Sequence, residues 1–247
     1  MDRLLYVSMT GAKENMVSMA KRANNLANAS TIGFKSDFQQ ARAMQAFGEG
    51  LPTRVFSMTE RAATNYDQGS YITTGRELDV AVKGEGWLVV KDSKGEEAFT
   101  RMGNLSISVT GELQTSTGLT LVDVGGNPII LPQMDKIVIN KDGTIHGLLA
   151  GATPDIPEDF QQLKLVNPQI QDLYKGNDGL FRRKDGEAEA VSADVRLANG
   201  KLESSNVNVV AEMTHLIQLQ RQFETQVKMM KTAEENDQAQ ERLLRMR

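Results

Sequence analysis

Residues 209–230 read VVAEMTHLIQLQRQFETQVKMM, and this stretch decides the fold. Its apolar positions return every three or four residues, which is the spacing of a helix with a coiled-coil seam. Residues 5–26, near the N-terminus, repeat the same spacing. The seam positions are Leu5, Met9, Ala12, Met16, Met19, Ala23, Leu26, Val209, Met213, Leu216, Gln220, Phe223, Val227 and Met230. A helix with one apolar face is marginal alone in water, so both ends are predicted to pack against partners.

The larger apolar seam residues are the expected assembly interface. They are Leu5, Met9, Met16, Met19, Leu26, Met213, Leu216, Phe223, Val227 and Met230. If neighbouring subunits cover these apolar faces, the contacts between subunits are heterologous. Heterologous contacts that do not close into a ring build a helical assembly, so the chain is predicted to be a subunit of a helical tube. Methionine at such positions is more typical of core packing than of a functional device. Candidate N-caps for the closing helix lie at residues 204–206.

The chain between the two helices has a different pattern. Residues 78–82 and 87–90 suit strands, and glycine-containing turns punctuate the sequence around them. We therefore expect an α+β fold: N- and C-terminal helices that pair as a coiled-coil core domain, and a central, mostly antiparallel β domain. The expected division is a terminal helical core domain at 1–35 and 203–247, an extended connecting arm at 36–68, and a β-rich outer domain at 69–202.

Composition excludes several classes of protein. The 247 residues carry a net charge of −4, which gives no electrostatic basis for nucleic-acid binding. No apolar run reaches the ~18–20 residues of a membrane span, and the N-terminal residues do not resemble a cleaved signal peptide. The absence of cysteine excludes disulfides, thiolate metal sites and cysteine nucleophiles.

Candidate catalytic residues are few and weak. His215 falls on the closing helix, where a surface histidine is a simpler interpretation than a ligand, and His146 follows a predicted hairpin strand. Gly84-Glu85-Gly86 lacks the third glycine of a nucleotide-binding loop. Residues 140–143 lack the twelfth-position glutamate of a calcium loop and suit a hairpin turn. We therefore predict no catalytic, cofactor-binding or metal-binding residue, and no cofactor.

Three segments of the sequence resemble one family. Residues 23–35 read ANNLANASTIGFK, residues 74–87 read TGRELDVAVKGEGW with FTRMG at 99–103, and residues 202–208 read LESSNVN with QRQFE at 220–224. These segments are similar, in the same order, to the ANNLAN-x-x-T-x-GFK/R, TGR-x-LD and LE-x-SNV signatures of bacterial flagellar rod and hook proteins. Trp87 and Leu105 depart from residues that are common in the family. Within it the chain looks most like the proximal-rod members.

The resemblance implies a structural subunit of the flagellar basal-body rod, not an enzyme. It implies terminal helices that pair in the rod core, a β domain outside, and contacts with copies of itself and with other proximal and distal rod subunits. It also implies passage through the flagellar type III export apparatus without a cleaved signal peptide, and a place in the rod across the periplasm. The junction between helix and outer domain is expected at Asn24, Asn25, Leu26, Asn28, Gly33 and Phe34.

Other interpretations remain open from the sequence. A distal-rod or hook-family protein is an alternative of the same class, and a binding module or enzyme with a coiled-coil handle is an alternative of another class. Trp87, the only tryptophan, opens an apolar run and is predicted to anchor the β core. An exposed subunit contact is the alternative role for Trp87.

Overall fold

The computed structural model describes residues 4–45, 55–59, 63–149 and 158–245. The chain divides into two compact units. A helical unit comprises Met1–Ala29, Ser36–Asn65 and Val207–Arg247, and a β unit comprises Ser30–Lys35 and Tyr66–Asn206. Compared with the expected division, this grouping places residues 30–35 with the strands and residues 36–65 with the helices. The α+β class and the antiparallel β domain are confirmed.

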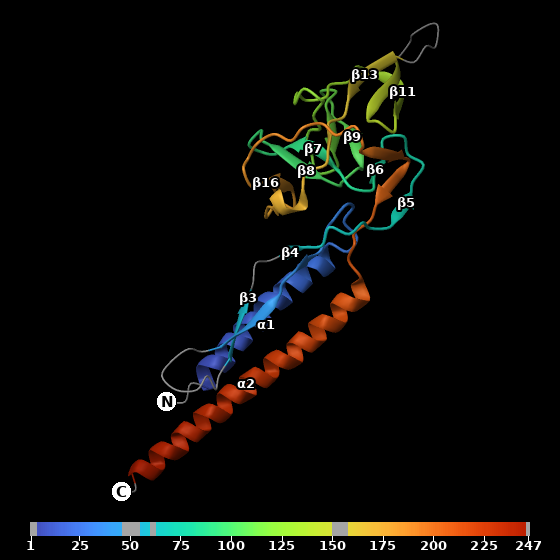
Figure 1. Cartoon of the computed structure of the whole chain (residues 1–247). Coiled ribbons are helices and arrows are strands. Elements are labelled where there is room, and N and C mark those ends of the chain that lie inside the picture. The colour runs from blue at the N-terminus through green and yellow to red at the C-terminus, as the bar shows by residue number, and fades with distance from the viewer. Residues whose placement is uncertain (1–3, 46–54, 60–62, 150–157, 246–247) are drawn as a thin grey trace. The chain divides into compact units, whose positions relative to one another are not determined.

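The helical unit is built on two long helices, α1 (Leu4–Ala27) and α2 (Val209–Arg245), which lie side by side (Figure 1). They run antiparallel, because Arg22 near the end of α1 pairs with Glu212 near the start of α2, whereas Gly11 faces Gln226. A Cβ atom at Gly11 would lie 3.1 Å from the Gln226 side chain, so glycine allows a close helix approach. The N-cap is Asn208 instead of a residue at 204–206, because its Oδ1 accepts a 3.1 Å bond from the Ala211 amide.

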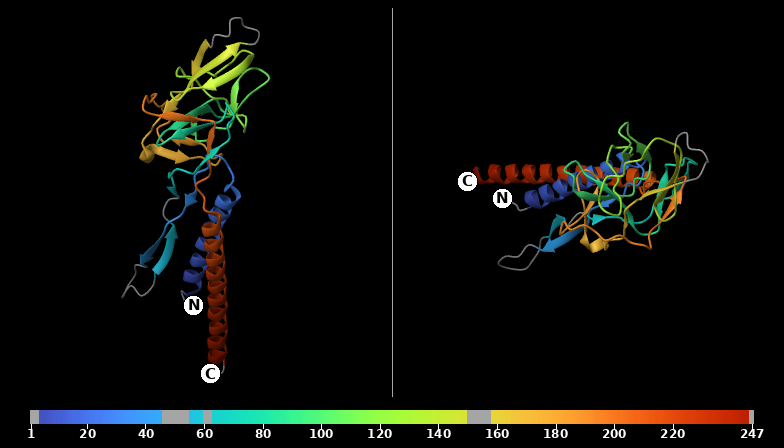
Figure 2. Two further views of the ribbon diagram at one scale, coloured as in Figure 1. Left: turned by 90° about the vertical axis from the view of Figure 1, so that its right-hand side faces the viewer. Right: turned by 90° about the horizontal axis from the view of Figure 1, so that it is seen from above.

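Four short strands belong to the described part of the helical unit. Antiparallel pairs join β1 (Asp37–Phe38) to β4 (Ala63–Thr64) and β2 (Ala41–Gln45) to β3 (Val55–Thr59). Figure 2 shows the β2–β3 ribbon in two further views. Helix α1 contacts β1 and β3 as well as α2. One face of α1 is therefore covered by strands and another by the second helix.

The β unit consists of short antiparallel strands. Its sheets have the orders β14-β7-β8-β16-β15, β11-β12-β13, β10-β9, β17-β6 and β18-β5. The elements are β5 (Tyr71–Thr73), β6 (Val80–Lys83), β7 (Trp87–Lys91), β8 (Glu97–Thr100), β9 (Leu105–Ile107), β10 (Leu113–Thr115), β11 (Met134–Ile139), β12 (Thr144–Leu149), β13 (Glu158–Gln162), β14 (Leu165–Val166), η1 (Ile170–Asp172), β15 (Leu173–Lys175), β16 (Phe181–Arg183), β17 (Arg196–Asn199) and β18 (Lys201–Glu203).

The sequence of β7 is apolar from Trp87 to Val90 because both faces of the strand are buried. Leu88 and Val90 point into a large aliphatic core, and Trp87 and Val89 point into a second, aromatic core with Phe181. Successive side chains of a strand alternate between its faces, so a strand buried on both faces needs apolar residues throughout. The Trp87 side chain is only 4% exposed, which confirms its predicted role as a core anchor.

Candidate functional site

The three signature segments meet at one buried carboxylate, that of Glu203 in β18. Its Oε1 accepts a 2.6 Å bond from Lys35 Nζ, and its Oε2 accepts a 3.0 Å bond from an Arg101 nitrogen. The Lys35 side chain is 1% exposed and the Glu203 side chain is fully buried. Each signature segment thus contributes one residue to this cluster. We call Lys35, Arg101 and Glu203 the charge junction.

Backbone groups complete the charge junction. The Gly69 amide donates to Glu203 Oε1 at 3.1 Å, and Lys35 Nζ donates to the Asp67 carbonyl at 2.8 Å. A second Arg101 nitrogen donates to a backbone carbonyl at 2.9 Å. A buried ion pair is tolerated only when further hydrogen bonds satisfy its remaining polar atoms. These contacts supply most of them, and Arg101 Nε has no hydrogen-bond partner among the described residues.

The electrostatics of the charge junction are unbalanced, with two cations around one anion. Burial lowers the pKa of the Lys35 ammonium, and the hydrogen bond and negative charge of Glu203 oppose that shift. The Arg101 guanidinium also lies 5.1 Å from the centre of the Trp87 ring, a cation–π distance. The only acid in the junction, Glu203, therefore stabilises two buried positive charges.

Three glycines allow close backbone contacts within the β unit. A Cβ atom at Gly33 would lie 2.4 Å from the Arg101 carbonyl carbon, one at Gly69 2.0 Å from the Ser204 oxygen, and one at Gly103 1.6 Å from the Val80 oxygen. Real Cβ atoms do not approach backbone atoms so closely. Gly33 and Gly103 stand in the signatures, and all three glycines allow close packing of the β unit.

Gly33→Ala is expected to destabilise the β unit. Gly33 has φ +70°, a conformation that costs a non-glycine residue roughly 1–3 kcal/mol, and the added methyl group meets the Arg101 backbone. Chemical denaturation followed by Trp87 fluorescence measures the loss. Gly95→Ala is the matched control, because Gly95 also has a positive φ but nothing lies within 4 Å of its Cβ position. Equal losses in the two variants would show that the contact with Arg101 is unimportant.

In the helical unit, Asn25 joins α1 to the strand that follows it. Its Oδ1 accepts from the Asp37 amide at 2.9 Å, and its Nδ2 donates to the Asp37 carbonyl at 2.8 Å. Glu212 of α2 accepts from Asn25 at 3.3 Å and from Arg22 at 2.9 Å. The Asn25 amide is fully buried and holds three elements together, so its role exceeds a helix stop.

The other expected junction residues have more local environments. Asn28 donates from its side chain to the Asn24 carbonyl at 3.0 Å, at the end of α1. Leu26 is half-buried on that helix. The Phe34 ring lies in the β unit, with Lys175 Nζ 4.1 Å from its centre. Gly33 and Phe34 thus lie in the β unit, which also contains the charge junction. The helical unit contains Asn24, Asn25, Leu26 and Asn28.

The seam positions, which include the expected assembly residues, fall into two sets on the helices. Positions seven residues apart form inner rows that are buried or half-buried: Ala12, Met19 and Leu26 on α1, and Leu216, Phe223 and Met230 on α2. The alternate positions form exposed outer rows: Met9, Met16 and Ala23 on α1, and Met213, Gln220 and Val227 on α2. Leu5 and Val209 are exposed. Each seam thus uses one row inside the chain and leaves one row at the surface.

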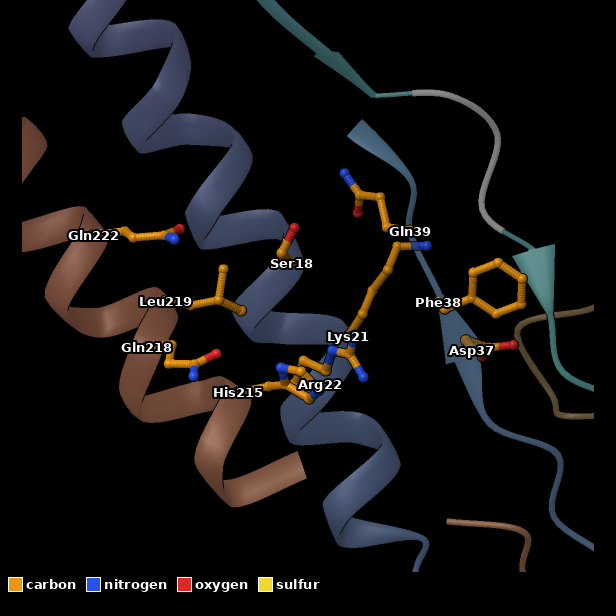
Figure 3. A pocket seen from close by; sticks show the side chains of 10 residues that line it. All are labelled: Ser18, Lys21, Arg22, Asp37, Phe38, Gln39, His215, Gln218, Leu219 and Gln222. Atoms are coloured by element: carbon orange, nitrogen blue, oxygen red, sulfur yellow. The ribbon is translucent and has the colours of Figure 1, made fainter. Parts of the chain in front are cut away.

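A pocket of about 220 Å³ lies within the helical unit, among α1, α2 and the residues around β1 (Figure 3). Its lining includes three basic side chains, Lys21, Arg22 and His215, and one acid, Asp37. Ser18 also lines it, but among the described residues no hydrogen bond joins Ser18 to His215. A general base that activates a serine hydroxyl lies within hydrogen-bond reach of it, and the described structure does not show that contact between Ser18 and His215.

The other weak candidates have structural roles. His146 lies on β12 and pairs with Asp159 on β13 and with the Asn140 side chain. Residues 140–143 form the hairpin turn between β11 and β12, with the Asn140 amide bonded to the Thr144 carbonyl. Within the described part of the chain, no three His, Asp or Glu side chains cluster as metal ligands.

Comparisons with known proteins agree on one family. Residues 81–147 match the "Flagellar hook protein FlgE/F/G D1 domain" and residues 198–243 match the "Flagellar basal body rod FlgEFG protein C-terminal". The chain is 36% identical to the flagellar basal-body rod protein FlgF of Salmonella typhimurium, over 100% of both chains. It is 35% identical to the FlgF of Escherichia coli over 96% of both chains. The chain belongs to the FlgF family of flagellar basal-body rod proteins.

Membership of the FlgF family confirms the expected class. The chain is a structural subunit of the flagellar basal-body rod and is not an enzyme. Relatives matched at 30–36% identity are FlgF proteins, whereas identity to the flagellar basal-body rod protein FlgG of Buchnera aphidicola is 27% over 94% of the chain, so the alternative family member is not favoured. Among the described residues, no helix has the length and apolar character needed to cross a membrane.

The charge junction of this FlgF-family chain was not predicted from its sequence. Lys35, Arg101 and Glu203 all fall inside the quoted motifs, but none was a candidate site residue. A signal was available, because each charge stands in a motif beside residues that the fold buries. The partners could not be paired, since 168 residues separate Lys35 from Glu203 and 102 separate Arg101 from Glu203.

Proposed function

We propose that this chain is a proximal-rod subunit whose outer rows bind the helices of neighbouring subunits. The single observation that carries the proposal is the exposure of apolar outer-row residues. Met9 is 51% exposed, Met16 59%, Met213 48% and Val227 42%. Full burial of one such side chain stabilises by roughly 1.5–3 kcal/mol, so half-exposed residues leave a large part of that energy for contacts between subunits.

The spacing of the outer rows supports coiled-coil contacts. Met9 and Met16, like Gln220 and Val227, are seven residues apart, which keeps them on one side of a helix in a supercoil. In this arrangement residues 1–35 and 203–247 form the core of the rod, residues 69–202 form an outer β domain, and residues 36–68 connect them. The partners are copies of this chain and other proximal and distal rod subunits.

Delivery to the rod follows from the family resemblance. We place the chain in the rod across the periplasm, reached through the flagellar export apparatus without a cleaved signal peptide. A failure of export would remove the chain from the rod as effectively as a failure of assembly. Secreted protein must therefore be measured beside assembled protein in any test.

The test is a charge placed on an outer row. Met213→Asp is expected to abolish incorporation into basal bodies and motility, because an aspartate cannot be buried in the subunit contact at acceptable cost. Thr214→Asp is the matched control, since Thr214 is exposed on the same helix but outside the rows. Normal rods from an exported Met213→Asp variant would show that the outer rows are not the assembly surface.

Phe223 is a less useful test residue than its size suggests. It is half-buried on an inner row, so Phe223→Asp also disturbs packing inside the chain. A defect in that variant would not separate folding of the helical unit from contact with a neighbour. Circular dichroism of Met213→Asp should match that of the parent, because Met213 is exposed and lies outside the inner row that packs within the chain.

A further inference from the structure

The helical unit holds most of the sulfur in this protein. The chain has twelve methionines and no cysteine, and the β unit contains only Met102 and Met134. Methionine is therefore the sole sulfur-containing residue that an oxidant can modify. The helical unit therefore contains most of the methionine side chains that an oxidant can modify.

Three methionines lie on the outer rows and are accessible in the free chain. Met9, Met16 and Met213 each expose about half of their surface. The β-unit residues differ, since Met102 is half-buried and its sulfur accepts weak bonds from Ser116 and Thr117 at 3.6 and 3.8 Å. Susceptibility of a methionine to oxidation follows its exposure.

We propose that Met9, Met16 and Met213 form a peroxide-sensitive modification site that controls association of the subunit. This inference rests on the proposed function of the outer rows. A peroxide transfers one oxygen atom to the thioether sulfur: the O–O bond breaks, the S–O bond forms, and sulfur loses two electrons. Hydrogen peroxide is reduced to water in the same step. The product is methionine sulfoxide, and sulfoxide reductases reverse it.

Oxidation changes the outer rows from apolar to polar. A sulfoxide oxygen that becomes buried between subunits loses its hydrogen bonds to water, and without a nearby donor it forms no hydrogen bond in their place. The same oxygen remains hydrated in the free chain, so oxidation leaves the fold intact and weakens association. Assembly would in turn bury the sulfur atoms, so the free subunit is the vulnerable form.

The structure provides an internal control for this site. Met44, Met58 and Met229 are also exposed, but they lie outside the outer rows. All three should be oxidised with little effect on association. Leucine is close to methionine in volume and cannot be oxidised, so Met→Leu variants keep each surface apolar.

The experiment treats the purified full chain with hydrogen peroxide and measures the mass increase at each methionine. Oxidation at Met9, Met16 and Met213 is expected to be several-fold faster than at Met102 and Met134. Sedimentation with purified neighbouring rod subunits is expected to show loss of association after treatment. Incubation with methionine sulfoxide reductases is expected to restore it.

Two triple variants decide whether the outer rows are responsible. The variant Met9→Leu/Met16→Leu/Met213→Leu should show the same association after peroxide as before it, whatever its starting level, whereas Met44→Leu/Met58→Leu/Met229→Leu should lose association on treatment as the parent does. Equal oxidation rates at all methionines, or full association of the oxidised parent, would overturn the inference. Failure of the proposed function has a different result, which is normal assembly of Met213→Asp.

Discussion

Glu203→Gln is expected to lower the free energy of unfolding of the β unit by about 3–5 kcal/mol, the usual cost of removing one partner from a buried ion pair. Glutamine has the same shape as glutamate, so the loss comes from charge. Without the carboxylate, Lys35 and Arg101 are two buried cations that have lost the ion-pair partner they share. Chemical denaturation followed by Trp87 fluorescence measures the change, because Trp87 lies beside Arg101 in the core.

Two further variants test the cause of that loss. Asp185→Asn breaks an exposed ion pair with Arg183 and should leave the denaturation midpoint unchanged. Replacement of all three junction residues, by Lys35→Met, Arg101→Leu and Glu203→Leu together, should recover part of the lost stability, because no charge then remains buried. If Glu203→Gln loses no more than Asp185→Asn, the charge junction does not stabilise the unit.

Trp87→Ala is the second change with a large expected effect, a loss of about 3–5 kcal/mol in the free energy of unfolding. The Trp87 ring centre lies 4.5 Å from that of Phe181 and 6.2 Å from that of Tyr66. Removing the indole leaves a cavity among aromatic rings that neighbouring strands hold apart. Unfolding must be followed by circular dichroism in the far ultraviolet, since the variant has no tryptophan.

Trp87→Phe is the control for cavity formation. It keeps an aromatic ring in the same place and should lose much less stability than Trp87→Ala, because most of the contact area remains. Comparable losses in the two variants would mean that the indole itself, through its contact with Arg101, matters more than the volume it fills. A loss below about 1 kcal/mol in Trp87→Ala would contradict the role of Trp87 as a core anchor.

Much of the fold could be predicted from local patterns. The periodicity of residues 5–26 and 209–230 predicted α1 and α2, and the unbroken apolar run from Trp87 predicted a buried strand. These patterns are visible because a helix or strand imposes its period on neighbouring residues. The motifs also predicted the family correctly.

The division of each seam into two rows could not be predicted. Leu216 and Val227 both fit one apolar stripe, but only the packing of α1 and α2 shows that Leu216 is half-buried and Val227 exposed. The N-cap was also predicted at the wrong residues, because residues 204–206 and Asn208 offer equivalent side chains. Sequence reports which residues can make a contact, and long-range packing selects among them.

The separation of the charged partners has a consequence for how the chain folds. A nascent chain emerges N-terminus first, and Lys35 and Arg101 are both present long before Glu203 appears. Neither cation can be buried favourably during that time, so the β unit cannot be completed early. Contacts across 102 and 168 residues also slow folding, since a long loop must close before any contact forms. We therefore expect completion of the β unit to wait for β18, its last strand.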